Sequence, residues 1–197
     1  MPFRAGSEVD VKEIDEKNWE LLRELNYDGT RQNFVVPVGM GTDFASVPRV
    51  FIWFLPQYGR YTKAAILHDY LWRRGVPGNE LTLPEADAIL RRAMRELGVP
   101  FLRRWIMWAA VRLGALKKPG GRTRWLRESW KVFPLALLAL PIVGPPAILI
   151  LVALALFYAI ELVVYLPLRV VAAAKRKRPQ ATPPKQVNAP ELTWKSA

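Results

Sequence analysis

The N-terminal part of the chain alternates short apolar and polar stretches in a way that predicts β-strands. The stretch WELLRELNYDGTRQNFVVPVG, residues 19–39, holds Asp28 and Gly29 near its middle. Asp-Gly between apolar runs favours a hairpin turn, because glycine accepts a positive φ. Pro37 has no backbone N–H to donate, so we expect the second strand to end there or to run along an edge. The pattern therefore predicts a small N-terminal β-hairpin or sheet.

Three segments further along the chain repeat apolar residues at helical spacing, over residues 60–74, 84–97 and 100–113. Thr82 and Glu85 form a capping-box pattern at the start of the second segment, which Gly98 closes. The apolar stripes expected to face the core are Ala86, Ile89, Leu90, Ala93, Met94 and Leu97 in the second helix, and Leu102, Trp105, Ile106, Ala109 and Leu113 in the third, which Gly114 is expected to end. Strands followed by about three packed helices predict the α+β fold class and a soluble domain over residues 1–116.

A long apolar segment follows over residues 132–168, with Glu161 as its one charged residue. Residues 147–166 are almost unbroken in their apolar character and make a helix of about 30 Å, the thickness of the hydrocarbon core of a bilayer. The other interpretation, a core helix of a soluble protein, fits less well because such helices are usually shorter and keep a polar stripe. We therefore expect a membrane segment.

The path of this segment has two solutions, because Gly144-Pro145-Pro146 interrupts it and proline breaks helical hydrogen bonding. In the first, residues 132–143 dip into the bilayer and the chain returns as a hairpin. In the second, they lie in the interface and only residues 147–166 span. Basic residues flank both ends, and the positive-inside rule favours the hairpin with both flanks in the cytoplasm. Residues 117–131 are expected to form a basic linker, and residues 169–197 a basic, Pro-rich disordered tail.

The net charge of +12 is concentrated near this apolar segment. Residues 1–116 hold 16 Lys/Arg and 14 Asp/Glu, whereas residues 117–197 hold 13 and 3. Basic clusters beside an apolar span are typical of attraction to anionic lipid headgroups, so we expect a membrane partner and no nucleic acid. The chain has no cysteine and one histidine, which excludes disulfides, thiolate nucleophiles and metal sites built from several histidines.

Several polar residues lie where helical packing would not put them. Asp87 borders the apolar stripe of the second helix, and His68 and Asp69 lie on the packed side of the first. Buried carboxylates need partners, because removing water from a charge is costly. The residues expected to converge are Asp43, Ser46, His68, Asp69 and Asp87 as a catalytic set, with Thr42 and Arg49 as binding residues.

This set is open to three interpretations. His68, oriented by an aspartate, activates Ser46 as a nucleophile. Alternatively, His68 and the aspartates hold a divalent metal with a bound water, although we expect no resident cofactor. In the third interpretation the polar network only stabilises the fold. The sequence leaves open whether the protein is an enzyme.

The motifs resemble a known family. VPVGMGTDFASVPR at residues 36–49, AAILHDYLWRRG at residues 64–75, the aspartate of PEADAILRRAM and the run WAAVRLGA are similar, in the same order, to the phage and bacterial proteins of domain of unknown function 1353. The resemblance covers residues 15–116, with Trp72 as a departure from an expected tyrosine. It implies a phage or prophage origin and assigns no activity.

Two functions follow. One is a membrane-anchored, hydrolase-like phage protein that acts in lysis or on the envelope. The other is a non-enzymatic structural or interaction module at the membrane, in contact with other phage or envelope proteins. Both place the protein at the inner membrane of a bacterial host, with its soluble domain in the cytoplasm.

Overall fold

The strands form two small antiparallel sheets. β1 (Val11–Glu13), β2 (Trp19–Leu21) and β5 (Gly41–Thr42) pair in the order β1-β2-β5, and β3 (Leu25–Asp28) pairs with β4 (Asn33–Val36). The computed structural model describes residues 2–45, 47–76, 78, 81–116, 122, 125–176 and 188–190. The predicted hairpin is β3–β4, and its second strand ends before Pro37 as expected. The α+β class is confirmed.

The hairpin turn differs in detail from the sequence pattern. The loop spans residues 29–32, and the N–H of Gly29 donates to the carbonyl of Gln32 at 3.1 Å. Gly29 does not use a positive φ. Glycine is required here for another reason, because a Cβ at this position would collide with the ring of Tyr27. That ring is fully buried between the hairpin and the helices.

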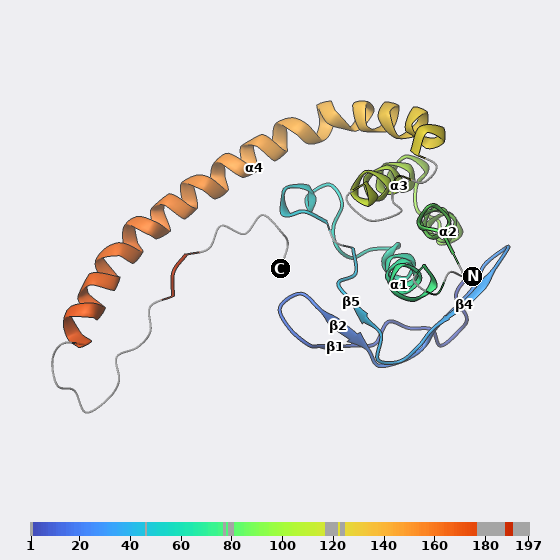
Figure 1. The fold of residues 1–197 in the computed structure, drawn as a ribbon, viewed down its shortest axis with the longest axis horizontal. Helices are drawn as coiled ribbons and strands as arrows, with labels where there is room; N and C mark the ends of the chain where they lie inside the picture. Colours follow the sequence, from blue (N-terminus) through green and yellow to red (C-terminus); the bar gives the residue numbers. More distant parts are fainter. Residues whose placement is uncertain are drawn as a thin grey trace.

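The helices agree with the predicted segments to within a few residues. They are α1 (Thr62–Tyr70), continued by one π-helical turn, η2 (Leu71–Gly75), then α2 (Leu83–Glu96) and α3 (Phe101–Ala115). α1 contacts the β3–β4 hairpin and α2, and α2 contacts α3, so the helices stack one after another on the strands (Figure 1).

The predicted caps of α2 are both present. The Glu85 carboxylate accepts hydrogen bonds from the backbone N–H and the hydroxyl of Thr82, at 2.9 and 2.8 Å. Gly98, with φ of +72°, follows the last turn. Each cap satisfies backbone groups that a helix end otherwise leaves without partners.

Two expectations for α3 are wrong. Gly114 lies inside the helix, which runs to Ala115. Leu102 and Leu113 are 43% and 36% exposed, whereas Trp108 and Arg112 are buried. The buried face is shifted because α3 packs against α2 on one side and the next helix on the other, and the second partner is not visible in the sequence of α3.

That next helix, α4 (Trp125–Arg176), is continuous over 52 residues, so the predicted hairpin is wrong. Five prolines lie within it, yet they bend the helix rather than end it (Figure 1). Residues 125–131 and 169–176, expected as linker and tail, are helical. The rest of the predicted disordered tail, apart from residues 188–190, lies outside the described residues.

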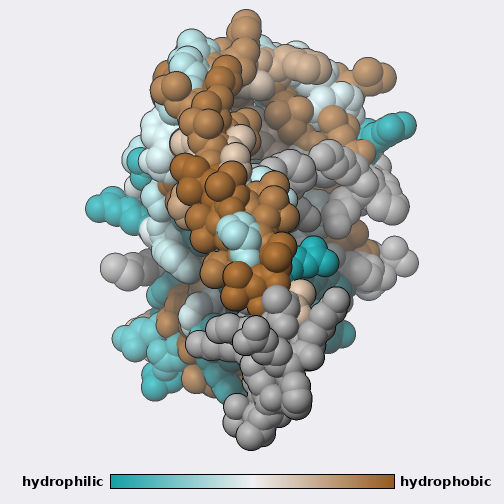
Figure 2. All heavy atoms as spheres, turned by 90° about the vertical axis from the view of Figure 1, so that its left-hand side faces the viewer, coloured by the Kyte–Doolittle hydropathy of each residue, from teal (hydrophilic) through white to brown (hydrophobic). Residues whose placement is uncertain are grey.

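The two halves of α4 have different surroundings. The first half packs on α3, where Val132 joins Trp108 and Ala109 in a small apolar cluster. Ala147 is the last buried residue along the described helix, and the part beyond it projects from the domain. Figure 2 shows a band of hydrophobic residues along the projecting helix. By length and composition α4 is able to cross a bilayer, and it is the one such helix in the described part of the chain.

Two glycines, Gly98 after α2 and Gly114 in α3, provide a matched test. Gly98→Ala is expected to lower the free energy of unfolding by about 1 kcal/mol, because alanine is strained at a positive φ. Gly114→Ala, inside α3 with nothing within 4 Å of its new methyl group, is expected to raise it by up to about 1 kcal/mol. Chemical unfolding of the full chain in detergent measures both. Destabilisation by Gly114→Ala would contradict the continuous α3.

Candidate functional site

The most deeply buried polar group of the predicted site is Asp87, on α2. Its side chain is fully buried. Oδ1 lies 2.8 Å from Nε2 of His68 on α1 and accepts a hydrogen bond from Nε1 of Trp72 at 3.1 Å. Oδ2 accepts a hydrogen bond from the Arg112 guanidinium on α3 at 3.0 Å. Both carboxylate oxygens are therefore bonded to protein side chains.

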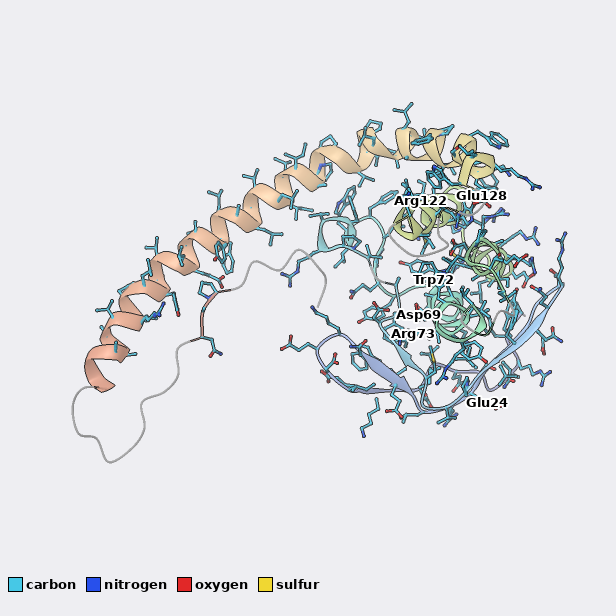
Figure 3. The ribbon with its side chains drawn as sticks, in the orientation of Figure 1. Glu24, Asp69, Trp72, Arg73, Arg122 and Glu128 are labelled. Atoms are coloured by element: carbon cyan, nitrogen blue, oxygen red, sulfur yellow. The ribbon has the colours of Figure 1, made fainter. Side chains whose placement is uncertain are left out.

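Arg112 extends this network to the apolar helix. Its side chain is also fully buried, and Nε lies 2.7 Å from the Glu128 carboxylate in the first turn of α4. The order His68–Asp87–Arg112–Glu128 alternates cationic or neutral nitrogen donors with carboxylates. We call these four residues the polar chain. Figure 3 shows its last member, Glu128, at the start of α4, and Trp72, the further partner of Asp87, beneath α3. Charges taken out of water are stable only when paired in this way.

A second interaction begins at the next residue of α1. The hydroxyl of Thr42, on β5, donates to Oδ2 of Asp69 at 2.6 Å and accepts from the backbone N–H of Phe44 at 2.9 Å. Burial raises the pKa of Asp69 to about 7; the hydrogen bond from Thr42 opposes this rise, and the charge of Asp43 adds to it. Asp69 is therefore able to hold or release a proton near neutral pH.

The loop after β5 is held in an unusual conformation. Phe44 has φ of +58°, a left-handed conformation that is rare for a bulky residue. Its side chain is buried, and the Thr42 hydroxyl fixes its backbone N–H. Nearby, the Arg73 guanidinium donates to the carbonyl of Gly41 at 2.8 Å (Figure 3). These contacts join β5 to α1 and η2.

The structure brings together some of the predicted site residues. His68 pairs with Asp87, and Thr42 pairs with Asp69. His68 and Asp69 are successive residues of α1, so the two pairs are adjacent on that helix. Asp43 lies close enough to Asp69 to influence its pKa. Of the other two predicted members, Arg49 is exposed at the start of η1 (Arg49–Phe51), and Ser46 lies outside the described residues.

The metal interpretation has no preformed donor set in the described part of the chain. No three His, Asp or Glu side chains there are grouped closely enough to hold an ion. The carboxylate of Asp87 is bonded to Arg112, a cation that a metal ion would have to displace. A hollow of about 410 Å³ lies next to β5, but none of the predicted site residues lines it. Its lining residues are Pro37, Val38, Gly39, Met40, Gly41, Arg73 and Arg74.

Sequence reasoning missed Arg112, Glu128 and the bonding role of Trp72. A signal was present for the first two. Arg112 is a single charge within the otherwise apolar run WAAVRLGA, and Glu128 is one of three acidic residues after residue 116. An isolated charge on a buried helix face requires a partner of opposite sign, and few carboxylates are available to α3 from the C-terminal side.

Asp69 gives the stability a defined pH dependence. In the native protein its carboxyl keeps its proton up to about pH 7, whereas in the unfolded chain it loses the proton near pH ~4. The stabilisation from protonated Asp69 is thus complete below that lower value and is lost as the pH rises to about 7. Asp69→Asn cannot ionise at this position. Its free energy of unfolding should therefore rise relative to that of the parent protein by about 1.4 kcal/mol for each pH unit across this window.

Chemical unfolding of both full-length proteins between pH 4 and pH 8 measures this difference. Thr42→Val is the control, since it removes the hydroxyl donor and leaves the carboxyl in place. A constant difference between Asp69→Asn and the parent across the range would contradict the raised pKa.

The comparison with known proteins gives one match. The model of the family described as a protein of unknown function, DUF1353, matches residues 19–111. No curated protein and no solved structure matches the chain. The matched range contains both hydrogen-bonded pairs on α1 and ends one residue before Arg112, so it excludes Glu128 and α4. The resemblance found in the motifs is thereby confirmed: residues 19–111 of this chain resemble the DUF1353 family.

Proposed function

We propose that this protein is a membrane-attached structural or interaction module whose polar chain holds the folded domain on the base of α4. The main support is the state of Asp87. Its carboxylate is fully buried and bonded through both oxygens to His68, Trp72 and Arg112. A general base or a metal ligand has to reach a substrate or an ion. The described hydrogen-bond partners of Asp87 are instead side chains of α1, η2 and α3.

The network favours attachment because each member comes from a different element. His68 is on α1, Asp87 on α2, Arg112 on α3 and Glu128 on α4. Trp108 of α3 and Val132 of α4 are buried in one apolar cluster at the same interface. Low dielectric strengthens the ion pairs and makes their disruption costly. The domain and the first half of α4 are therefore expected to move as one body.

Membrane attachment rests on the second half of α4. Residues 147–166 provide twenty residues of mostly apolar helix beyond the last buried position, about 30 Å in length. Basic residues on both flanks suit anionic headgroups. Because α4 is continuous, its two ends lie on opposite sides if it spans. Residues 117–131 hold six Lys/Arg and residues 169–178 hold five, so the cytoplasmic placement of the domain stays a prediction.

Other parts of the functional hypothesis also stay predictions. They are the phage or prophage origin that the resemblance implies, contact with further phage or envelope proteins, a role in lysis, and the expectation that nucleic acid is not a partner. A hydrolase-like activity remains the second candidate. The observation in its favour is Asp69, whose pKa of about 7 suits proton transfer at neutral pH.

Asp87→Asn separates the two candidates for the polar chain. If the polar chain has a structural role, this substitution is expected to lower the free energy of unfolding by about 3–5 kcal/mol, because the buried guanidinium of Arg112 loses a charged partner. Denaturant unfolding of the full chain in detergent measures the loss. Asp28→Asn, which removes a carboxylate from an exposed pair with Arg4, is the matched control and should leave stability nearly unchanged.

Unchanged or increased stability of Asp87→Asn would contradict the structural role. Catalytic carboxylates often reduce stability, so their removal tends to leave the fold intact or to strengthen it.

A further inference from the structure

Residues 49–60 form an apolar, aromatic segment that the polar chain does not use. The sequence is RVFIWFLPQYGR. It begins as η1 and continues through turns to the start of α1. Trp53 and Tyr58 are 46% and 56% exposed, although a domain of this size has a core available for such side chains. Two exposed aromatic residues within one short segment call for a physical explanation.

The segment is held in a fixed conformation. Its own residues Val50 and Leu55 are buried, and the N–H of Leu55 donates to the carbonyl of Phe51 at 2.8 Å. The buried Tyr61 donates its hydroxyl to the carbonyl of Pro56. The two exposed aromatic rings also have fixed neighbours, since Trp53 contacts Phe54 and Tyr58 packs edge-on against Phe44. Trp53 and Tyr58 are therefore presented outward by an ordered backbone.

The segment lies beside α4, the helix proposed to enter the bilayer. η1 packs against α4. In Figure 1 the segment lies on the side of the domain from which α4 projects, close to where the helix leaves the domain. The mostly apolar residues 147–166 of α4 begin at the last buried position of that helix. If residues 147–166 cross the hydrocarbon core, the headgroup layer lies at the level of this segment.

The charge of the segment suits the same location. Residues 44–68 contain three Lys/Arg and no Asp/Glu, and both Arg49 and Arg60 are exposed. Trp and Tyr concentrate at membrane–water interfaces, where an apolar ring and a polar hydrogen-bonding group are both satisfied. Arginine beside them attracts anionic lipid. Aromatic and cationic side chains are thus combined where a headgroup layer would be.

We propose that residues 49–60 are a lipid-binding segment that inserts Trp53 and Tyr58 into the headgroup layer of the bilayer crossed by α4. This inference rests on the proposed membrane attachment. It adds a second contact, which fixes how the domain is oriented on the membrane surface. α4 by itself would leave the domain free to rotate about the axis of the helix.

The absence of native cysteine makes a direct test possible. Trp53→Cys, Phe157→Cys and Val35→Cys each carry one environment-sensitive fluorophore in the full chain, reconstituted in vesicles that contain anionic phosphatidylglycerol. Phe157 is exposed in the projecting half of α4. Val35, 50% exposed, matches Trp53 in exposure, and its strand β4 lies on the side of the domain away from the projecting part of α4 (Figure 1). Quenchers are placed on lipids either at the headgroup or deep in the acyl chain.

The expected result is quenching at position 53 by headgroup quenchers, quenching at position 157 by acyl-chain quenchers, and no quenching at position 35. Replacing phosphatidylglycerol by neutral lipid should reduce the quenching at position 53, and Arg60→Gln should do the same.

If position 157 is quenched but position 53 is as little quenched as position 35, the lipid-binding segment is wrong and α4 still enters the membrane. No quenching at 157 overturns the proposed membrane attachment itself. If the fluorophore at position 53 is shielded to an extent that depends on protein concentration and not on lipid, a second copy of the chain covers the segment. That result also overturns the proposal.

Discussion

One buried carboxylate constrains the arrangement of all four α-helices. Asp87 has no contact with solvent, and it is tolerated because His68, Trp72 and Arg112 donate to it or lie within hydrogen-bond distance. Arg112 is equally buried and needs the carboxylates on both of its sides, including Glu128 of α4. A charge in a low-dielectric interior accepts few geometries. The angles and positions of the helices have to satisfy these bonds as well as the apolar packing around them.

The same contacts join the small α+β domain to α4, a helix that is long and apolar enough to cross a bilayer. The first half of α4 is part of the domain, because Val132 packs with Trp108 and Ala109 and because Glu128 completes the polar chain. In the described part of the chain no residue of α4 beyond Ala147 is buried, and residues 147–166 are mostly apolar.

Much of this architecture could be predicted from local sequence. The β3–β4 hairpin, the capped α2 and the pairing of His68 with an aspartate follow from turn residues, caps and the position of polar residues on helix faces. The buried face of α3 could not be predicted, because it depends on where α4 lies. The continuity of α4 was missed for a different reason. Proline removes one hydrogen bond and bends a helix, yet neighbouring turns keep their own bonds, and the helix continues past Pro145 and Pro146. Arg112 was visible as an isolated charge, but its two carboxylate partners come from separate helices.

The central claim, that the polar chain couples the domain to α4, is tested most directly by the interaction free energy between Asp87 and Glu128. The two carboxylates are on different helices and are joined through Arg112. Unfolding free energies of Asp87→Asn, Glu128→Gln and the double variant, all as full chains in detergent, give this quantity. The double variant should lose at least about 1 kcal/mol more than the two single losses combined, because only then has the buried guanidinium lost both Asp87 and Glu128. Losses that add to within about 0.5 kcal/mol would contradict the account.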